Sequence, residues 1–297
     1  MPVIPEMFIT GGRGRLARLL LKEFSTSGLV RAFSRRSGDG MFCVEELFHP
    51  HALKPCDVLL HLAWSSVPKT AEQQPGLSEN EDLPMLQRLL IAIRTIPASR
   101  RPHLVFFSSG GAVYGNAPGR PNIESDECRP IGQYGRVKRA AEVMIESWAV
   151  QHNLSYTILR ISNPYGYIVS TESPQGVIPR AINCALSGNP LTLWGDGTAR
   201  KDYLYHTDML SALATVIARR PIGTFNLCSG ISHSVREVLT EIESQTGKII
   251  TLAFSPAAAW DVQESRLAND RLCAVSDWKP RISLGEGIRL SVRSYQG

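Results

Sequence analysis

Short apolar runs alternate with longer amphipathic segments along the first 165 residues of this 297-residue chain. The apolar runs have the length of buried parallel strands, and the segments between them repeat apolar residues at helical spacing. The sequence predicts strands over residues 8–10, 29–33, 41–45, 57–63, 104–107 and 156–160, with helices over residues 16–24, 83–96 and from 134 onward. Strands that alternate with helices predict an α/β fold of the Rossmann type, a doubly wound parallel sheet whose ligands bind beyond the carboxyl ends of the strands.

This rhythm changes near residue 164, where proline and glycine become frequent. The change predicts a Rossmann-type domain over residues 1–163 and a smaller C-terminal domain over residues 164–297. The segment of about residues 200–228 is a candidate to return to the first domain.

The composition is that of an ordinary globular protein, with 43% hydrophobic and 20% charged residues. No apolar run approaches the ~18 residues of a membrane span, and no secretory signal is visible, so we expect a cytoplasmic protein that does not bind a membrane. Six scattered cysteines without Cys-x-x-Cys spacing indicate reduced thiols, and seven histidines without ligand spacing predict no metal site. The net charge of +5 is spread along the chain, which favours an anionic small molecule over nucleic acid as the partner.

A glycine-rich turn joins the first predicted strand to the first helix. Thr10 is followed by Gly11-Gly12-Arg13-Gly14-Arg15-Leu16-Ala17. Glycines in this position let the backbone approach a pyrophosphate, and the amides of the helix N-terminus face its negative charge. The turn therefore predicts a dinucleotide cradle. We accordingly expect residues 1–163 to be an NAD(P)-binding Rossmann domain and residues 164–297 to be a smaller substrate-binding domain.

The second predicted strand ends in Ser34-Arg35-Arg36, where an enzyme specific for NAD would carry an acidic residue for the ribose 2′-hydroxyl. A hydroxyl with two guanidiniums instead suits the 2′-phosphate of NADP, so NADP is favoured over NAD without excluding it. Glu46 and Leu47 are expected to flank the adenine.

Tyr134 and Lys138 lie four residues apart at the start of a predicted helix and therefore on one face of it. A tyrosine with a pKa of about 10 needs a shift of ~3 units, or ~4 kcal/mol, to act as a base near neutrality. One ammonium at ~4 Å supplies about that energy at an effective dielectric constant of about 20. The pair predicts an acid/base tyrosine, although a boundary tyrosine beside a solvated lysine fits the spacing as well.

These motifs and several others occur in order along nearly the whole chain. They are Thr10–Ala17, His61-Leu62-Ala63, Asn80, Ser108-Ser109 with Val113-Tyr114-Gly115, Tyr134 with Lys138, Arg160–Gly166, Gly195-Asp196-Gly197, Lys201–Tyr205 with Asp208, and Asp277–Pro280. Together they resemble the extended short-chain dehydrogenase/reductases, specifically the NAD(P)-dependent nucleotide-sugar epimerase/dehydratase family. The Ser-Ser-Gly-Gly-x-Val-Tyr-Gly form looks most like members that epimerise UDP-sugars at C4.

The resemblance implies roles for individual residues. The catalytic residues would be Tyr134, Lys138 and Ser109. The cofactor would contact Gly11, Gly12, Arg13, Gly14, Arg15, Leu16, Ser34, Arg35, Arg36, Glu46, Leu47, Leu62, Ala63, Trp64, Asn80, Ser108, Tyr134, Lys138 and Ile161. The substrate would contact Ser65, Gly110, Asn163, Val177, Leu193, Trp194, Arg200, Lys201 and Arg266.

Two departures from the family pattern stand out. Gly110 occupies the position where members usually carry a serine or threonine, which leaves Ser109 as the substitute hydroxyl. The arginine often found near the C-terminal substrate loop is missing around Ala257–Trp260. Binding of the diphosphate would then pass to Arg200, Lys201 or Arg266, although Arg200 and Lys201 could equally belong to an exposed hairpin.

The expected activity is UDP-sugar 4-epimerisation in polysaccharide biosynthesis, by transient oxidation at C4. The alternatives are an NADPH-dependent reductase of nucleotide 4-keto sugars and a cofactor-binding protein without turnover, such as a redox sensor or RNA-binding scaffold. A 4,6-dehydratase is disfavoured because no Asp-Glu pair follows Ser109. The resemblance also implies a homodimer that packs its 83–96 and Tyr134 helices into a four-helix bundle.

Overall fold

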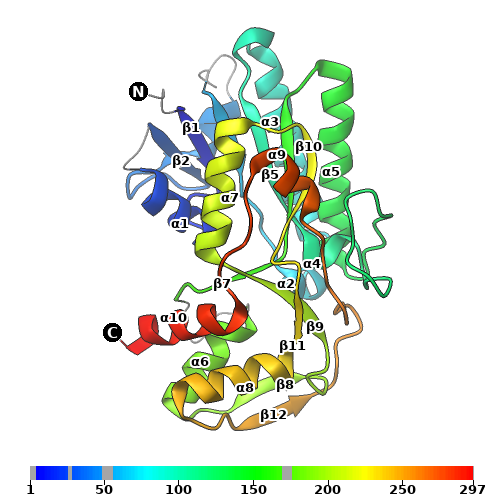
Figure 1. Cartoon of the computed structure of the whole chain (residues 1–297). Coiled ribbons are helices and arrows are strands. Elements are labelled where there is room, and N and C mark those ends of the chain that lie inside the picture. The colour runs from blue at the N-terminus through cyan, green and yellow to red at the C-terminus, as the bar shows by residue number, and fades with distance from the viewer. Residues whose placement is uncertain (1–4, 26–28, 49–55, 169–175, 297) are drawn as a thin grey trace. The chain divides into compact units, whose positions relative to one another are not determined.

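The computed structural model describes residues 5–25, 29–48, 56–168 and 176–296. These residues form two compact units. Figure 1 shows the helices and strands of the chain with their labels. The first unit is drawn from segments 1–108, 136–159 and 213–225, and the second from segments 109–135, 160–212 and 226–297.

The first unit is built on a seven-stranded sheet with the order β10-β6-β5-β4-β1-β2-β3. Its strands are β1 (Met7–Thr10), β2 (Val30–Ser34), β3 (Phe42–Cys43), β4 (Val58–His61), β5 (His103–Ser109), β6 (Tyr156–Ile161) and β10 (Gly223–Leu227). The pairs β1–β2, β1–β4, β2–β3 and β4–β5 are all parallel. Every residue of β4 is buried, as a strand covered on both faces requires. The predicted Rossmann-type fold is confirmed.

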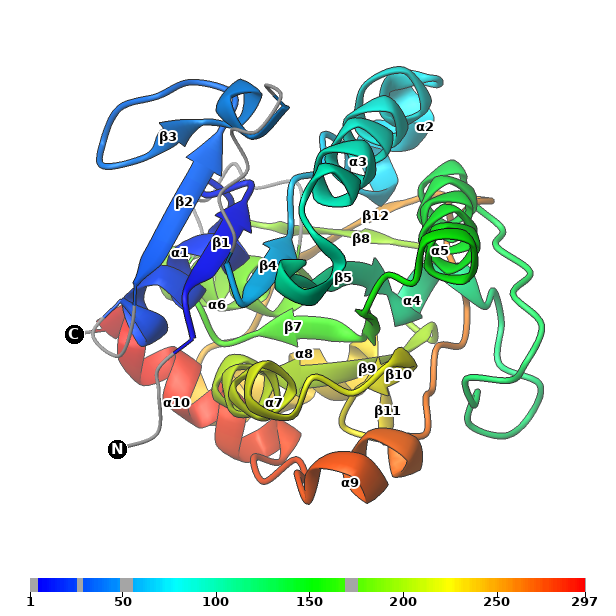
Figure 2. The same cartoon turned by 90° about the horizontal axis from the view of Figure 1, so that it is seen from above.

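Helices cover both faces of this sheet. They are α1 (Arg15–Phe24), α2 (Pro68–Gln73), α3 (Leu77–Thr95), α5 (Gln133–His152) and α7 (His206–Arg219), with 3₁₀ helices η1 (Val44–Phe48) and η2 (Ala98–Arg100). Figure 2 shows α3 and α5 on one face of the strands and α1 and α7 on the other. Phe8, Leu59 and Phe106 of the sheet form a buried core with Leu89 of α3 and Ile145 of α5.

The second unit contains two small sheets and its own helices. Its elements are α4 (Gly110–Val113), β7 (Asn163–Tyr165), α6 (Val177–Ser187), β8 (Leu191–Trp194), β9 (Arg200–Tyr205), β11 (Ser232–Ser234), α8 (Val235–Thr246), β12 (Leu252–Ser255), α9 (Asp270–Ser276) and α10 (Leu284–Gln296). One sheet has the order β11-β9-β7 and the other pairs β12 with β8. A capping box starts α8, because Ser234 and Glu237 each accept the other's backbone N–H, at 3.1 and 2.8 Å.

Two predicted elements differ from the structure. The strand predicted over residues 41–45 is only two residues long, because Glu46 accepts the Cys43 N–H at 2.9 Å and the chain turns into η1. The helix predicted from residue 83 begins at Leu77 and contains Pro84 in its interior. The prediction placed its start too late because residues 78–82 are polar and hid the apolar pattern of the first turns.

Within the described segments, no helix has both the length and the apolar character needed to cross a bilayer.

Candidate functional site

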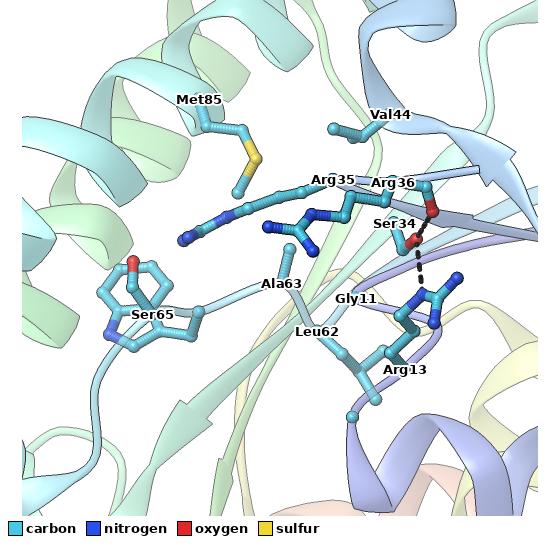
Figure 3. Close-up of a pocket in the computed structure, with 12 residues that line it drawn as sticks. Gly11, Arg13, Ser34, Arg35, Arg36, Val44, Leu62, Ala63, Ser65 and Met85 are labelled. Atoms are coloured by element: carbon cyan, nitrogen blue, oxygen red, sulfur yellow. Dashed lines mark hydrogen bonds between the residues drawn. The ribbon is translucent and has the colours of Figure 1, made fainter. Parts of the chain in front are cut away.

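A cavity of about 520 Å³ opens in the first unit at the carboxyl ends of the strands. It is lined by Gly11, Arg13, Gly14, Ser34, Arg35, Arg36, Val44, Leu62, Ala63, Trp64, Ser65 and Met85. Figure 3 shows these side chains converging from the ends of β1, β2 and β4 and from α3. Among the residues predicted to bind the cofactor, the turn, the Ser34 segment and the Leu62 segment are thus brought together.

The floor of the cavity is the glycine turn between β1 and α1. Gly11 has φ 75°, and a Cβ at this position would lie 2.7 Å from the Ala63 nitrogen. Only glycine allows both this backbone conformation and this approach of the turn to the end of β4. Gly14 closes the turn by donating its N–H to the Gly11 carbonyl at 2.8 Å. Gly12, Arg15 and Leu16 belong to the same segment but do not line the cavity.

Three arginines gather around Ser34. Arg13 Nε donates to Ser34 Oγ at 3.4 Å, and the side chains of Arg35 and Arg36 extend across the cavity in Figure 3. Arg13 pairs with Asp39 at 3.1 Å and Arg35 with Glu81 at 2.8 Å, and both carboxylates are well exposed. Arg36 forms no ion pair with another described residue, so its charge is available to an anion in the cavity.

The apolar wall of the cavity comes from Val44 and Met85. Neither residue was predicted from the sequence to contact the cofactor. Glu46 and Leu47, which were expected there, do not line it. Glu46 caps the turn at Cys43, and Leu47 is buried in the core. The sequence carried no separate signal for Val44, because residues 41–45 were expected to form one strand, whereas Val44 begins η1 in the structure.

Lys138 is buried in the first unit with an exposure of 4%. Its Nζ donates to the Phe107 carbonyl at 2.8 Å and lies 3.7 Å from the centroid of the Trp64 ring. Burial lowers the pKa of Lys138 to about 7, while Asp82 and Glu142 act in the opposite direction. This burial excludes the alternative in which Lys138 is a solvated lysine beside a tyrosine at the edge of the core.

Tyr134 lies one turn before Lys138 on α5 and is half-buried. A Cβ on the neighbouring Gly135 would overlap the Ala112 carbonyl oxygen, so glycine lets the first turn of α5 pack closely on α4. Ser109 ends β5 directly before α4, and Ser108 donates to the buried Glu142 at 2.5 Å. Tyr134 and Ser109 belong to the second unit and Lys138 to the first.

Asn80 is exposed on α3 and does not line the cavity, whereas Asp82, two residues further on, is completely buried. Ile161, another predicted cofactor contact, is buried at the end of β6. Asp82 was missed because a carboxylate in a polar stretch carries no sign of burial in the sequence.

Two basic residues predicted to bind substrate have partners inside the second unit. Arg200 donates to the Ser232 carbonyl at 2.7 Å and pairs with Glu237 at 3.2 Å. Lys201 pairs with Asp261 at 2.7 Å and also donates to the Val262 carbonyl. Arg266 differs, because its buried Nε has no hydrogen-bond partner in the described part of the chain.

The other substrate candidates are spread over this unit and the cavity. Asn163 donates to the Asp202 carbonyl at 2.8 Å, and Val177 is the first residue of α6. Leu193 is buried, while Trp194 is exposed and lies 6.4 Å from the Trp260 ring. Ser65 lines the cavity of the first unit.

No group of three or more His, Cys, Asp or Glu side chains that could hold a metal is present among the described residues.

The parallel sheet, the glycine turn and the cavity define a dinucleotide-binding protein of the Rossmann type. Residues 7–228 match the model of the NAD dependent epimerase/dehydratase family, and the chain belongs to that family. It is therefore an enzyme, as predicted, and the resemblance inferred from the motifs is confirmed.

Similar proteins show how the family varies. The chain is 29% identical to UDP-glucose 4-epimerase of Mycolicibacterium smegmatis over 81% of its own length and 76% of the relative. It is also 29% identical to dTDP-4-dehydro-6-deoxyglucose reductase of Escherichia coli, over 65% of this chain and 61% of the relative. The crystal structure of Thermus thermophilus UDP-glucose 4-epimerase in complex with NAD has a TM-score of 0.88 at 26% identity, covering 98% of this chain and 99% of that one.

Proposed function

We propose that this enzyme is an NAD(P)-dependent nucleotide-sugar epimerase that acts on a UDP-sugar at C4. The observation that carries the proposal is the buried ammonium of Lys138, one helical turn from Tyr134 on α5. A buried lysine is costly unless its charge is used, and a phenolate is the partner that this spacing offers. The similarity to the mycobacterial and Thermus epimerases supports the same activity.

In the proposed reaction Tyr134 is the acid/base group and Lys138 stabilises its phenolate. Tyr134 removes the proton of the sugar hydroxyl and later returns it, while Ser109 donates a hydrogen bond to the reacting oxygen. A bound NAD(P) would supply the hydride acceptor and donor for this transient oxidation of the sugar carbon, and inversion requires that the hydride return to the opposite face of the keto sugar. The Phe107 carbonyl accepts a hydrogen bond from Lys138 Nζ at 2.8 Å and so fixes the position of the ammonium.

The residues of the cavity fit such a cofactor. We propose that Gly11, Gly14 and the N-terminus of α1 hold the pyrophosphate, because the turn has no Cβ to block its approach. The cluster of Arg13, Ser34, Arg35 and Arg36 supports a preference for NADP over NAD, since it offers guanidiniums where a carboxylate would select NAD. Val44 and Met85 supply an apolar wall.

A second candidate is an NADPH-dependent reductase of a nucleotide 4-keto sugar. The same arginine cluster favours it, because net reduction draws on NADPH, and the Escherichia coli relative is a reductase. Both candidates use Tyr134 and Lys138 in the same roles. They differ in whether the hydride returns to the sugar from which it came.

We propose that residues 164–297 bind the sugar nucleotide and that the protein acts in the cytoplasm in polysaccharide biosynthesis.

We also propose a homodimer, because Ile91 of α3 and Val143 and Val150 of α5 are apolar and exposed. Multi-angle light scattering would give twice the chain mass if this is right, and the mass of one chain would refute the dimer.

The activity is tested by incubating the protein with UDP-glucose and UDP-N-acetylglucosamine and following the C4 epimers by NMR. An epimer formed without net change of the cofactor supports the epimerase. NADPH oxidation on a UDP-4-keto sugar without epimer formation would instead identify the reductase. Inertness in both assays, despite cofactor binding, would refute both activities for these substrates.

A further inference from the structure

The segment Trp64-Ser65 follows β4, and its Trp64 ring covers the ammonium of Lys138. The Trp64 ring centroid lies 3.7 Å from Lys138 Nζ, and the Phe106 ring lies 4.8 Å from it on β5. An ammonium over the face of an aromatic ring is attracted by the electrons of the ring, and more strongly when both are shielded from water. The position of the indole therefore bears directly on the charge of Lys138.

Asp82 of α3 holds this segment in place. Its side chain is completely buried, and both carboxylate oxygens accept the Ser65 backbone N–H at 3.0 Å. Ser65 Oγ also donates to Asp82 Oδ1 at 2.5 Å. These contacts tie α3 to the residue next to Trp64, so the carboxylate fixes the backbone that carries the indole.

The charges that face Lys138 come from several elements. Glu142 of α5 is buried. Its carboxylate accepts a hydrogen bond from Ser108 Oγ at 2.5 Å and forms an ion pair with Arg139 at 2.9 Å. His61 of β4 is neutral near pH 7, because burial and the neighbouring Lys138 lower its pKa to about 3. Tyr134 precedes Lys138 by one turn of the helix. The charge of Glu142 is thus paired with that of Arg139. Asp82, in contrast, forms no ion pair with a cation in the described segments.

We propose that Asp82 is a positioning residue for Lys138, which holds the Trp64 indole over the ammonium and helps to keep it protonated. The proposal rests on the role assigned to Lys138 above. It explains why a carboxylate is buried beside a serine, although burying an uncompensated charge is costly. It also gives Trp64 a function as the cover of the catalytic ammonium.

The charge of Lys138 can be followed without an assay of activity. Protein labelled with 5-fluorotryptophan should give a ¹⁹F signal for each of the five tryptophans, and Trp64→Phe identifies the signal of Trp64. This signal should titrate near pH 7 in the wild type and lose that titration in Lys138→Met. In Asp82→Asn the midpoint should fall by about 1 unit or more, because a nearby opposite charge has been removed.

Matched variants separate the proposed role from a general change of charge or fold. Glu23→Gln removes an exposed carboxylate of α1 and should leave the Trp64 titration unchanged. Ser65→Ala keeps every charge and removes only the hydroxyl contact, so the Trp64 signal should shift or broaden. If Asp82→Asn fails to fold, Ser65→Ala decides the question.

The proposal is overturned if the Asp82→Asn midpoint equals that of the wild type, or if the Trp64 signal is indifferent to Lys138→Met or to Ser65→Ala. Failure of the proposed function looks different. An inert protein whose Trp64 titration shifts as expected would refute the epimerase and leave the role of Asp82 intact. An active epimerase with an unshifted titration would do the reverse.

Discussion

Gly110 packs directly against Leu267. A Cβ on Gly110 would overlap Leu267 Cδ1 and lie 2.9 Å from the Arg160 carbonyl oxygen, both of them deeply buried residues. The neighbouring Gly111 has room, because its Cβ would lie 3.6–3.8 Å from the Asn163 amide and Ser265 Oγ. A serine or threonine at position 110, usual in the family that the sequence resembles, therefore has no space here.

This packing predicts opposite results for two serine substitutions. Gly110→Ser should destabilise the protein by about 1–3 kcal/mol, because an added side chain must displace Leu267 or the backbone of β6. Gly111→Ser should change stability little, since its Cβ meets ordinary contacts. Thermal unfolding of the two variants measures the difference. Equal melting temperatures for Gly110→Ser and the wild type would show that the site is not closely packed.

Tyr134→Phe should lower the rate of the proposed epimerisation by at least ~10²-fold, because the phenylalanine cannot accept or return a proton. Cofactor binding should persist, since Tyr134 does not line the cavity. Tyr156→Phe, at a half-buried tyrosine of β6, serves as the control and should retain the wild-type rate. A near-normal rate in Tyr134→Phe would remove this tyrosine from the acid/base role.

The burial of Lys138 predicts how stability depends on pH. Its pKa falls from 10.5 to about 7 in the folded protein. The unfolded chain therefore holds more protons between these values, and the contribution of Lys138 to stability rises with pH across this window. Lys138→Met removes the titration, so its stability relative to the wild type should be highest below pH 7 and should decline toward pH 10. Urea unfolding at several pH values tests this, and a constant difference would contradict it.

The arginine cluster predicts a selective effect on the cofactor. Arg36→Ala should raise the Kd for NADP⁺ about tenfold or more, because a charge-assisted hydrogen bond contributes roughly 1.5–3 kcal/mol. The Kd for NAD⁺ should change little. Arg18→Ala removes the same charge from an exposed position of α1 and should alter neither affinity. Equal losses for both cofactors in Arg36→Ala would argue against a 2′-phosphate contact.

Arg266 and Arg200 should respond differently to substitution. Arg266→Ala should raise the KM for the UDP-sugar about tenfold, because its guanidinium has a buried nitrogen without a protein partner in the described segments. Arg200→Ala should mainly lower stability, by up to about 1 kcal/mol, since Arg200 is bound to Glu237 and Ser232. Initial-rate kinetics and thermal unfolding of both variants distinguish them. An unchanged KM in Arg266→Ala would exclude a contact with the diphosphate.

Local patterns account for the parts of the protein that the sequence determined. The strand, the glycine turn and the helix N-terminus are consecutive in the chain, so Gly11, Arg13 and Gly14 could be assigned to one cavity wall from their spacing. Ser34 was located in the same way, as the residue that ends the second strand. The apolar runs determined the parallel sheet, because a strand covered on both faces must be apolar throughout.

The tertiary structure decided which residues share a face or a cavity when they are distant in the chain. Asp82 rather than Asn80 is buried near Lys138, and this depends on how α3 is rotated against the sheet. Val44 and Met85 reach the cavity only because η1 and α3 meet there. The closeness of Gly110 to Leu267 joins segments that no local pattern relates. Burial and long-range contact depend on the packed fold as a whole, whereas turns and strand ends depend on neighbouring residues.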